Sequence, residues 1–280
     1  MNKVFFLDAY ALIFRAYYAF IKNPRINSKG VNTSAIFGFM NSLLDVIQKE
    51  KPTHLAIAFD SSAKTFRHDM FPAYKATREA TPEDIRKSIP YIKQIIEALE
   101  IPMFEVPGYE ADDVIGTLAK DFARRDYMVF MMTPDKDYCQ LVDTNIFMYK
   151  PSRSGSDVEI WGIPEVQRSF EVQFPAQVID VLGLWGDASD NIPGAPGIGE
   201  KTAKKLIKEF GSIESLLQQT DKLSGKIKEN LIQFKDQVLL SKKLVTIHTS
   251  VPLTINEDDV KLTKPDVSKV TPIFEELEFK

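Results

Sequence analysis

The chain has 280 residues, of which 44% are hydrophobic and 26% are charged, and its formal net charge is −4. These values are ordinary for a soluble globular protein and leave room for one large α/β domain and a smaller helical one. No apolar stretch reaches the roughly 18 residues of a membrane span, and the single cysteine, Cys139, excludes an internal disulfide, so we expect a cytoplasmic protein without a membrane anchor.

Apolar runs alternate with helix-like segments over residues 1 to about 180, a pattern typical of a mostly parallel sheet flanked by helices. The predicted strands are Lys3–Leu7, His54–Phe59, Met103–Val106, Tyr127–Met132 and Ile146–Met148. The predicted helices are Thr33–Lys49, Glu83–Leu99, Ala111–Arg125 and Gln177–Leu182. Basic and aromatic residues without a regular period fill Ser61 to Thr81, where we expect a mobile connection. Ser152 to Asp157 reads as a polar turn, and short Lys-rich helices follow Pro193.

Acidic residues occur in five groups, three of which follow predicted strands. The groups are Asp8; Asp60; Glu110, Asp112 and Asp113; Asp135 and Asp137; and Asp187 and Asp190. Because ligands bind beyond the carboxyl ends of parallel strands, these carboxylates should meet at one edge of the sheet. Any one of them alone is most simply a helix cap. Together they predict a metal site, since gathered like charges repel and a divalent cation relieves the repulsion.

The chemical nature of the candidate ligands indicates which metal ions the site would bind. None of the five groups contains histidine or cysteine, and oxygen ligands select Mg²⁺ or Mn²⁺ over zinc. Two such ions about 4 Å apart activate water and stabilise the leaving oxygen of a phosphodiester. The chain has no Walker-type loop, which disfavours an ATPase. We predict an enzyme that uses two Mg²⁺ ions on phosphates, with Mn²⁺ as a substitute.

A glycine-rich segment, Pro193 to Ala203, is the second signal. Gly194, Gly197 and Gly199 stand before a predicted helix, where backbone N–H groups and the helix N-terminus favour a phosphate. From Lys201 to Lys243 there are ten lysines and five acids. A plain helix–turn–helix connection and a solvated helical face are the alternatives. We prefer an interpretation in which this segment binds the backbone of duplex nucleic acid without reading bases.

With both signals on one chain, the sequence resembles the 5′-nuclease superfamily of flap endonucleases, most closely the N-terminal 5′→3′ exonuclease domain of bacterial DNA polymerase I. The match covers nearly all 280 residues. Ala9-Tyr10 departs from the Gly-Ser that many relatives have after the first aspartate. The motifs that carry the resemblance are Leu7-Asp8, Phe14-Arg15-Ala16-Tyr17-Tyr18, Ala58-Phe59-Asp60, Phe66-Arg67, Tyr74-Lys75-Ala76-Thr77-Arg78, Glu110-Ala111-Asp112-Asp113, Asp135-Lys136-Asp137, Gly186 to Gly194, and Gly197-Ile198-Gly199.

The resemblance implies a PIN-like core over residues 1–180, with a helical arch at about 61–90. It implies a second region over 181–280 that carries a helix–three-turn–helix, often with a potassium ion, for binding duplex DNA. The chain ends abruptly after Phe279-Lys280, which we interpret as the end of a domain excised from a protein with a polymerase module.

The resemblance also assigns residues. The ligands of the first metal would be Asp8, Asp60, Glu110 and Asp112, with Asp113 nearby; those of the second would be Asp135, Asp137, Asp187 and Asp190. In the arch, Arg67, Lys75 and Arg78 would steer the scissile phosphate, although basic residues there also suit a plain soluble surface. Phe14, beside Arg15, would stack on a base, with a core aromatic as the alternative. Duplex contacts would come from Gly197, Gly199, Lys201, Thr202, Lys204 and Lys205.

The implied function is a monomeric 5′→3′ exonuclease and 5′-flap endonuclease, acting on flaps, nicks and gaps in primer removal and DNA repair near the bacterial nucleoid. A PIN-like ribonuclease shares the sheet and the acids, but the glycine segment and the basic second half argue against it. Tyr10 excludes a phosphatase of the Asp-x-Asp type. A non-catalytic module that binds DNA structures would be favoured if any of Asp60, Asp112, Asp135 or Asp187 were neutral, and none is.

Overall fold

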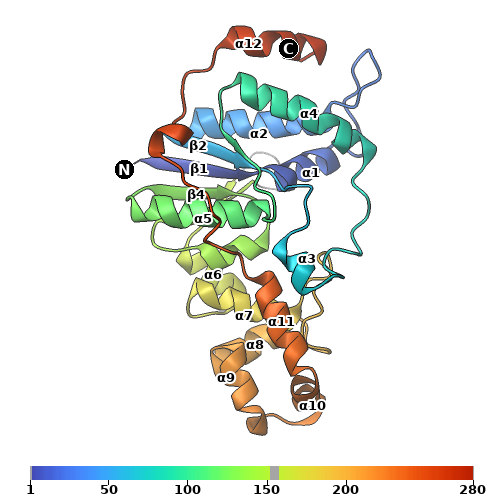
Figure 1. Cartoon of the computed structure of the whole chain (residues 1–280), viewed down its shortest axis with the longest axis vertical. Helices are drawn as coiled ribbons and strands as arrows, with labels where there is room; N and C mark the ends of the chain where they lie inside the picture. Colours follow the sequence, from blue (N-terminus) through green and yellow to red (C-terminus); the bar gives the residue numbers. More distant parts are fainter. Residues whose placement is uncertain (1, 152–157, 280) are drawn as a thin grey trace.

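A six-stranded sheet forms the centre of the molecule in a computed structural model that describes residues 2–151 and 158–279 (Figure 1). The strand order is β3-β2-β1-β4-β5-β6, and every neighbouring pair is parallel except β5 with β6. The strands are β1 Lys3–Asp8, β2 His54–Ala58, β3 Met103–Phe104, β4 Met128–Met132, β5 Ile146–Pro151 and β6 Val158–Trp161. The prediction of a mostly parallel sheet flanked by helices is therefore confirmed.

Each of the five predicted strands is present, whereas β6 was not predicted. The inner strands are continuous apolar runs because both faces of the sheet are covered; Val4 to Leu7 are at most 1% exposed. Strand β6 is a short, exposed edge strand whose Glu159 breaks the apolar pattern. The polar turn predicted at Ser152 to Asp157 lies outside the described residues.

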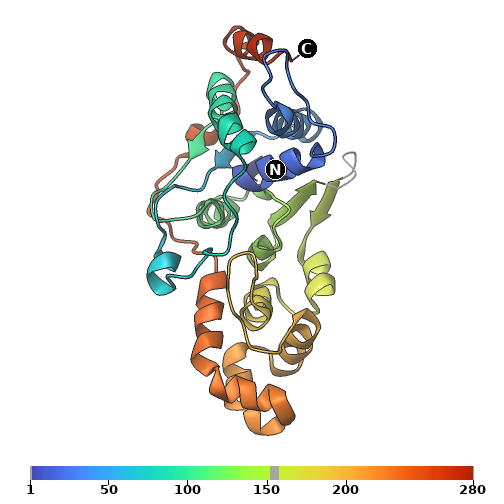
Figure 2. The same ribbon diagram turned by 90° about the vertical axis from the view of Figure 1, so that its right-hand side faces the viewer.

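Helices cover the two faces of the sheet unequally. On one face α5 (Ala111–Arg124) packs on Phe6 and Val129 of the inner strands. On the other face α1 (Ala9–Ala19), α2 (Ser34–Glu50) and α4 (Glu83–Ala98) pack on Phe5 and Leu7 (Figures 1 and 2). Two helices in the first part of the chain, α1 and α3 (Phe66–Met70), were not predicted. Helix α1 is apolar around much of its circumference, and α3 is held by a capping box between Thr65 and His68.

A set of short helices forms the end of the molecule opposite α12 (Val267–Glu276), which returns to pack on α4 (Figures 1 and 2). The remaining elements, in chain order, are η1 Lys136–Leu141, α6 Ile163–Phe170, η2 Pro175–Gln177, α7 Val178–Trp185, α8 Glu200–Phe210, α9 Ile213–Gln218, η3 Thr220–Lys222, α10 Gly225–Gln233, α11 Lys235–Val245 and η4 Glu257–Val260. Among the described residues, no helix combines the length and apolarity that crossing a membrane requires.

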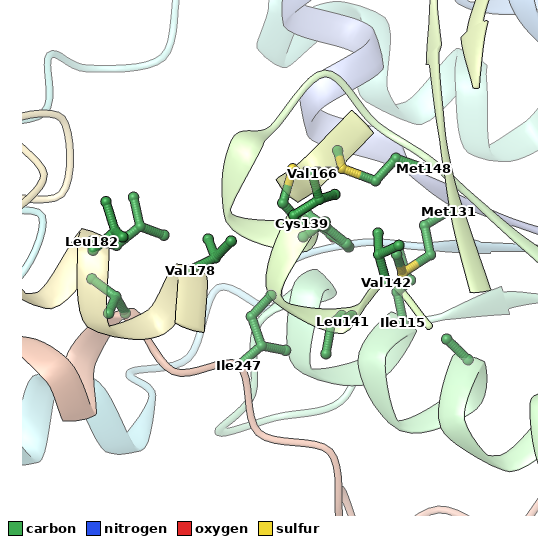
Figure 3. Close-up of a cluster of buried hydrophobic side chains, with 14 of the residues drawn as sticks. Ile115, Met131, Cys139, Leu141, Val142, Met148, Val166, Val178, Leu182 and Ile247 are labelled. Carbon is green, nitrogen blue, oxygen red and sulfur yellow. Dashed lines mark hydrogen bonds between the residues drawn. The ribbon is translucent and has the colours of Figure 1, made fainter. Parts of the chain in front are cut away.

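One apolar core joins the helices α7 to α11, which we call the helical region, to the sheet. Figure 3 shows Met131 and Met148 of the sheet, Val178 of α7 and Ile247, which follows α11, with Cys139 and Leu141 of η1 between them. All of these side chains are buried in a single cluster. Because the core is continuous, the helical region packs against the sheet through buried apolar side chains.

Candidate active site

Carboxylates from several elements line one cavity at the carboxyl edge of the sheet. Strand β1 lies between β2 and β4, so Asp8 at its end stands beside the segments that carry Asp60 and Asp135. The cavity has a volume of about 730 Å³. The predicted site residues that line it are Asp8, Phe14, Asp60, Arg67, Lys75, Arg78, Glu110, Asp112, Asp135, Asp137 and Asp190.

Main-chain donors hold Asp8 and Asp60. The N–H of Ala11 donates to Asp8 Oδ1 at 3.1 Å, and the Tyr138 hydroxyl donates to Asp8 Oδ2 at 3.0 Å. The N–H of Ala111 donates to Asp60 Oδ1 at 2.7 Å. Burial, and then the neighbouring charge of Asp60, raise the pKa of Asp8 to about 7. Burial also raises the pKa of Asp60.

The connection from Ser61 to Pro82 supplies positively charged side chains to two other acids, Glu110 and Asp190. Lys75 Nζ donates to Glu110 Oε1 at 2.7 Å, and the Tyr74 hydroxyl lies 2.9 Å from Glu110 Oε2 and 3.0 Å from Asp190 Oδ2. Arg78 forms an ion pair with Asp190. Lys75 and Arg78 therefore face the carboxylates rather than solvent alone.

Helix α4 forms the last part of the segment predicted as an arch at about 61–90. From Glu83 onward the chain is helix α4, whose Ile85, Ile92 and Ile95 are fully buried against the sheet. The segment before it rests on the turn that carries Asp190: the Lys75 N–H donates to the Asp190 carbonyl at 2.9 Å, and the Asn191 side chain donates to the Ala73 carbonyl at 2.7 Å. The part that lies over the cavity is therefore 61–82.

A second group of acids surrounds Lys136. Its Nζ lies 2.6 Å from Asp187 Oδ2 and 3.3 Å from Asp137 Oδ1. Despite that ion pair, Asp137 Oδ1 is buried without a hydrogen-bond partner among the described residues. Burial, and then Asp135, raise the pKa of Asp137 to about 7. Partial burial acts to raise the pKa of Asp187, but hydrogen bonds from Lys136 and Ser189 outweigh it and leave that pKa lowered.

Arg67 and Asp113 are buried and bind each other beside the acids of the cavity. Arg67 is 1% exposed and Asp113 is fully buried, and the two form a bidentate ion pair with N–O distances of 2.7 and 2.8 Å. A guanidinium fixed in this way is not available to a DNA phosphate, because its donors are already used inside the protein. The structure gives Arg67 partners inside the protein, and its role in steering phosphate stays a prediction.

The donor set fits divalent metal ions, although the acids now bind protein cations. Within residues 2–151 and 158–279, no group of three or more histidine, cysteine, aspartate or glutamate side chains is arranged as a metal site. The carboxylates instead contact Lys75, Arg78 and Lys136. The donors are all oxygens, Asp137 Oδ1 lacks a hydrogen bond, and the pKa of Asp8 is raised. A hard cation prefers oxygen ligands. It would give Asp137 Oδ1 a partner and would lower the raised pKa of Asp8.

The glycine segment forms a tight turn that leads into α8. Gly194 and Gly197 have φ of +61° and +76°, a region that favours glycine, and Gly199 is the N-cap of α8. Lys201 and Lys205 are exposed on α8, and Thr202 is half-buried. Lys204 instead pairs with Glu200 and lies over the Phe170 ring.

Two further predicted residues lie on α1. Phe14 is half-buried in the cavity wall with its ring centroid 6.4 Å from that of Tyr18, and Arg15 is half-buried beside it. Three side chains that contact the acids, Tyr74, Lys136 and Tyr138, were not predicted. Each is the chain neighbour of a predicted residue, and that adjacency was the available signal.

Two family models match the chain: "5'-3' exonuclease, N-terminal resolvase-like domain" over residues 3–171 and "5'-3' exonuclease, C-terminal SAM fold" over residues 173–268. DNA polymerase I of Bacillus subtilis (strain 168) is 40% identical over 280 residues, which are 99% of this chain and 31% of that protein. The 5′-3′ exonuclease of Aquifex aeolicus (strain VF5) is 36% identical over 280 residues, covering 100% of this chain and 93% of that protein.

A solved structure shares the fold over the same length. The flap endonuclease of bacteriophage T5, in a complex with DNA and metal ions, superposes with a TM-score of 0.74 at 19% identity, covering 99% of this chain and all of that one. The chain thus spans about a third of the length of the polymerase relatives that it matches. The resemblance seen in the motifs is confirmed.

Proposed function

The chain belongs to the 5′-3′ exonuclease family, and on that premise we propose that it is a Mg²⁺-dependent nuclease that cuts DNA at 5′ flaps, nicks and gaps. The observation that carries the proposal is the convergence of acids from separate elements in one cavity beneath a basic connection. Mn²⁺ would substitute for Mg²⁺, since both prefer oxygen ligands.

The acids fall into two groups that support two ion sites. Bound ions would activate water and stabilise the leaving oxygen of the phosphodiester. The Tyr138 hydroxyl holds Asp8, and the Ala111 N–H holds Asp60. Both carboxylates are therefore oriented before a ligand binds. We assign Asp8, Asp60, Glu110 and Asp112 to the first ion and Asp135, Asp137, Asp187 and Asp190 to the second.

Lys75 and Arg78 would bring the scissile phosphate to the acids. Both line the cavity, and each is within ion-pair distance of a carboxylate that a metal ion would bind. A negatively charged phosphate approaches a cavity of carboxylates only where positive charge offsets the repulsion. These two side chains supply that charge from the protein itself. Phe14, in the same wall, offers an apolar ring on which a terminal base can stack.

Duplex DNA would lie along α8 and the turn before it. The exposed main chain at Gly197 and Gly199 and the side chains of Lys201, Thr202 and Lys205 form this surface, and a potassium ion on the carbonyls of the turn would strengthen it. Lys204 contributes less, because Glu200 already neutralises it. We assign residues 1–180 to the nuclease core and 181–280 to duplex binding, apart from Asp187 and Asp190, which complete the site of the second ion, in a monomer.

The wider setting is also a proposal. The polymerase relatives contain this region as about a third of a longer chain, which supports a link to a polymerase module. We accordingly place the protein in the bacterial cytoplasm at the nucleoid, in primer removal and DNA repair.

The decisive experiment is cleavage of a 5′-flap duplex labelled at the 5′ end, with and without Mg²⁺. Wild type is compared with Asp135→Asn and Lys75→Ala. We expect a flap-length product that requires Mg²⁺, disappears in Asp135→Asn, and falls strongly in Lys75→Ala while duplex binding persists.

Two results would redirect the assignment. Tight flap binding with no product in Mg²⁺ or Mn²⁺ would make the protein a DNA-binding module. Faster cleavage of a single-stranded RNA than of the DNA flap would favour the ribonuclease alternative.

A further inference from the structure

Arg67 connects three parts of the molecule through buried hydrogen bonds. From α3 its Nη1 and Nη2 bind Asp113 of α5, at 2.7 and 2.8 Å. Its Nε donates to the Leu244 carbonyl at 2.9 Å, and Nη2 donates to the Thr246 carbonyl at 3.1 Å. Both carbonyls lie where α11 ends. One side chain therefore joins the connection over the cavity, the helix behind the acids and the last helix of the helical region.

The same guanidinium stands directly behind two acids of the cavity. Nη1 is 3.6 Å from Glu110 Oε2, and Nη2 is 3.9 Å from Asp112 Oδ2. Asp113 in turn accepts the main-chain N–H of Glu110 at 3.1 Å and that of His248 at 2.7 Å. The ion pair thus fixes both the backbone and the charge environment at the start of α5.

Neighbouring contacts hold the same C-terminal segment. Gln140 donates to the Val245 carbonyl and accepts the Ile247 N–H, each at 2.9 Å. Thr117 of α5 accepts the Val251 N–H at 3.0 Å. Within this set, Arg67 contacts the side chains of Glu110 and Asp112, whereas Gln140 donates to the Asp137 carbonyl at 2.9 Å. A displacement of α11 would therefore reach the side chains of the first group of acids at Arg67.

Helix α11 also holds the glycine turn of the proposed duplex surface. Gln237 donates to the Gly194 carbonyl at 2.9 Å, and Ser241 Oγ accepts the Gly194 N–H at 3.1 Å. A path of hydrogen bonds along α11 therefore runs from the turn to Arg67 and, through Asp113, to the Glu110 main chain. Ion-pair contacts of 3.6 and 3.9 Å join Arg67 to the Glu110 and Asp112 side chains. The distance between the duplex surface and the acids is set along this path.

We propose that Arg67 is a positioning residue that holds Glu110 and Asp112 at a fixed separation from the duplex-binding turn, and so determines which phosphodiester is cut. The inference rests on the proposed nuclease function. In this role Arg67 does not contact the DNA phosphates. It sets the position of the acids relative to the bound duplex, so its substitution changes the position of the cut and the rate of cleavage.

The test uses Arg67→Lys, which keeps the charge. An ammonium is a point donor and cannot reproduce the planar fork that binds Asp113 and two carbonyls together. Asp113→Asn is the second variant; its one carbonyl oxygen can accept only one of the Glu110 and His248 N–H groups, which bind different oxygens of Asp113, and it carries the test if Arg67→Lys does not fold. The matched control is Arg125→Lys at the far end of α5, where an arginine likewise binds a carboxylate, Asp121, and a carbonyl, Ile255.

Products from a 5′-labelled flap duplex are resolved to single nucleotides, and binding of the same duplex is measured by anisotropy in EDTA. We expect wild type and Arg125→Lys to cut at one dominant position. Arg67→Lys and Asp113→Asn should spread cleavage over adjacent phosphodiesters and lower kcat about tenfold or more, since misplacement by about 1 Å costs up to about 100-fold. Their KM and duplex affinity should stay within about twofold of wild type, because no DNA contact is removed.

Four outcomes would overturn the inference. Weaker duplex binding in Arg67→Lys with an unchanged cut position would make Arg67 a phosphate contact. A lower melting temperature with unchanged cut positions and kcat in both variants would make the pair merely structural. A wild type that binds the duplex but cuts nothing would remove the proposed function and this inference together, whereas a cutting wild type with unaltered variants removes the inference alone.

Discussion

The acidic cavity and the exposed face of α8 are proposed to bind the same DNA, yet their charges are arranged in opposite ways. Lys75 and Arg78 in the cavity and Lys136 beside it all contact carboxylates, and Asp8 and Asp60 are held by hydroxyl and main-chain donors. On α8, Lys201 and Lys205 are exposed to solvent. One region is a connected network, and the other is a set of separate charges.

This difference determines how each region should respond to substitution. Charges in a partly desolvated cavity interact strongly and depend on exact placement, whereas exposed charges are screened within about 10 Å at moderate salt. A change in the cavity should therefore alter the rate of the chemical step. A change on α8 should alter only the affinity for DNA and its dependence on salt.

The largest effect is expected from Asp112→Asn. Losing one carboxylate from the proposed ligands of the first ion should lower kcat by at least about 100-fold, comparable to removing one transition-state contact in other enzymes. The matched control is Asp143→Asn, which removes an exposed carboxylate that pairs with Lys120 away from the cavity. Single-turnover cleavage of the flap duplex measures both. Equal rates in the two variants would contradict the assignment of the cavity as the catalytic site.

Gly194→Ala should produce the next largest effect, through folding rather than chemistry. Gly194 has φ of +61°, and a Cβ there would lie 2.6 Å from the Gly186 nitrogen and 2.7 Å from the Leu184 carbonyl oxygen. A residue forced into this conformation costs on the order of 1–3 kcal/mol, before the backbone clash is added. We expect a clear fall in melting temperature.

Gly199→Ala is the partner experiment on the same turn. Gly199 has an extended backbone, and a Cβ there meets nothing within 4 Å. Stability should change little, whereas duplex affinity should fall if a phosphate approaches this main chain closely. A large loss of stability in Gly199→Ala would show that the turn is held by contacts other than those of Gly186 and Gly194.

The sequence allowed the parallel sheet and the meeting of the acids at its edge to be predicted, because both follow from local patterns and from one rule about parallel strands. It did not allow the place of Arg67 to be predicted. Its partners Asp113 and Leu244 are 46 and 177 residues away along the chain. Phe66-Arg67-His68-Asp69 also reads locally as a polar surface. Strand β6 was missed for a related reason, since an exposed edge strand needs no apolar alternation.

The sequence also did not allow the contacts of Lys136 to be predicted, although it places Lys136 between Asp135 and Asp137. Which acids a lysine neutralises depends on the turn that brings Asp187 to it, 51 residues later in the chain. The structure therefore adds a question that the motif did not raise: whether a protein cation competes with the proposed second ion.

Lys136→Met addresses that competition and is expected to act in the opposite direction from the aspartate variants. Removing the ammonium leaves Asp137 and Asp187 without their cation, so the affinity for a divalent ion should rise about threefold to tenfold, an estimate discounted for solvent screening. Calorimetric titration with Mn²⁺ measures it. Lys120→Met, at an exposed ion pair, is the control and should leave Mn²⁺ affinity unchanged. Unchanged or weaker binding in Lys136→Met would show that the lysine does not compete with the metal.

The smallest effect should come from Lys205→Ala on the exposed face of α8. Losing one phosphate contact should weaken duplex binding about twofold to threefold near physiological salt and lower the slope of log K against log salt by about 1. Lys204→Ala, one residue earlier, should change the slope less, because Glu200 already neutralises Lys204 and Phe170 lies beneath it. Anisotropy titrations at several salt concentrations compare the two. Equal slopes would mean that the duplex displaces Glu200 from Lys204, and α8 would then form part of a charge network, as the cavity does, rather than a set of separate charges.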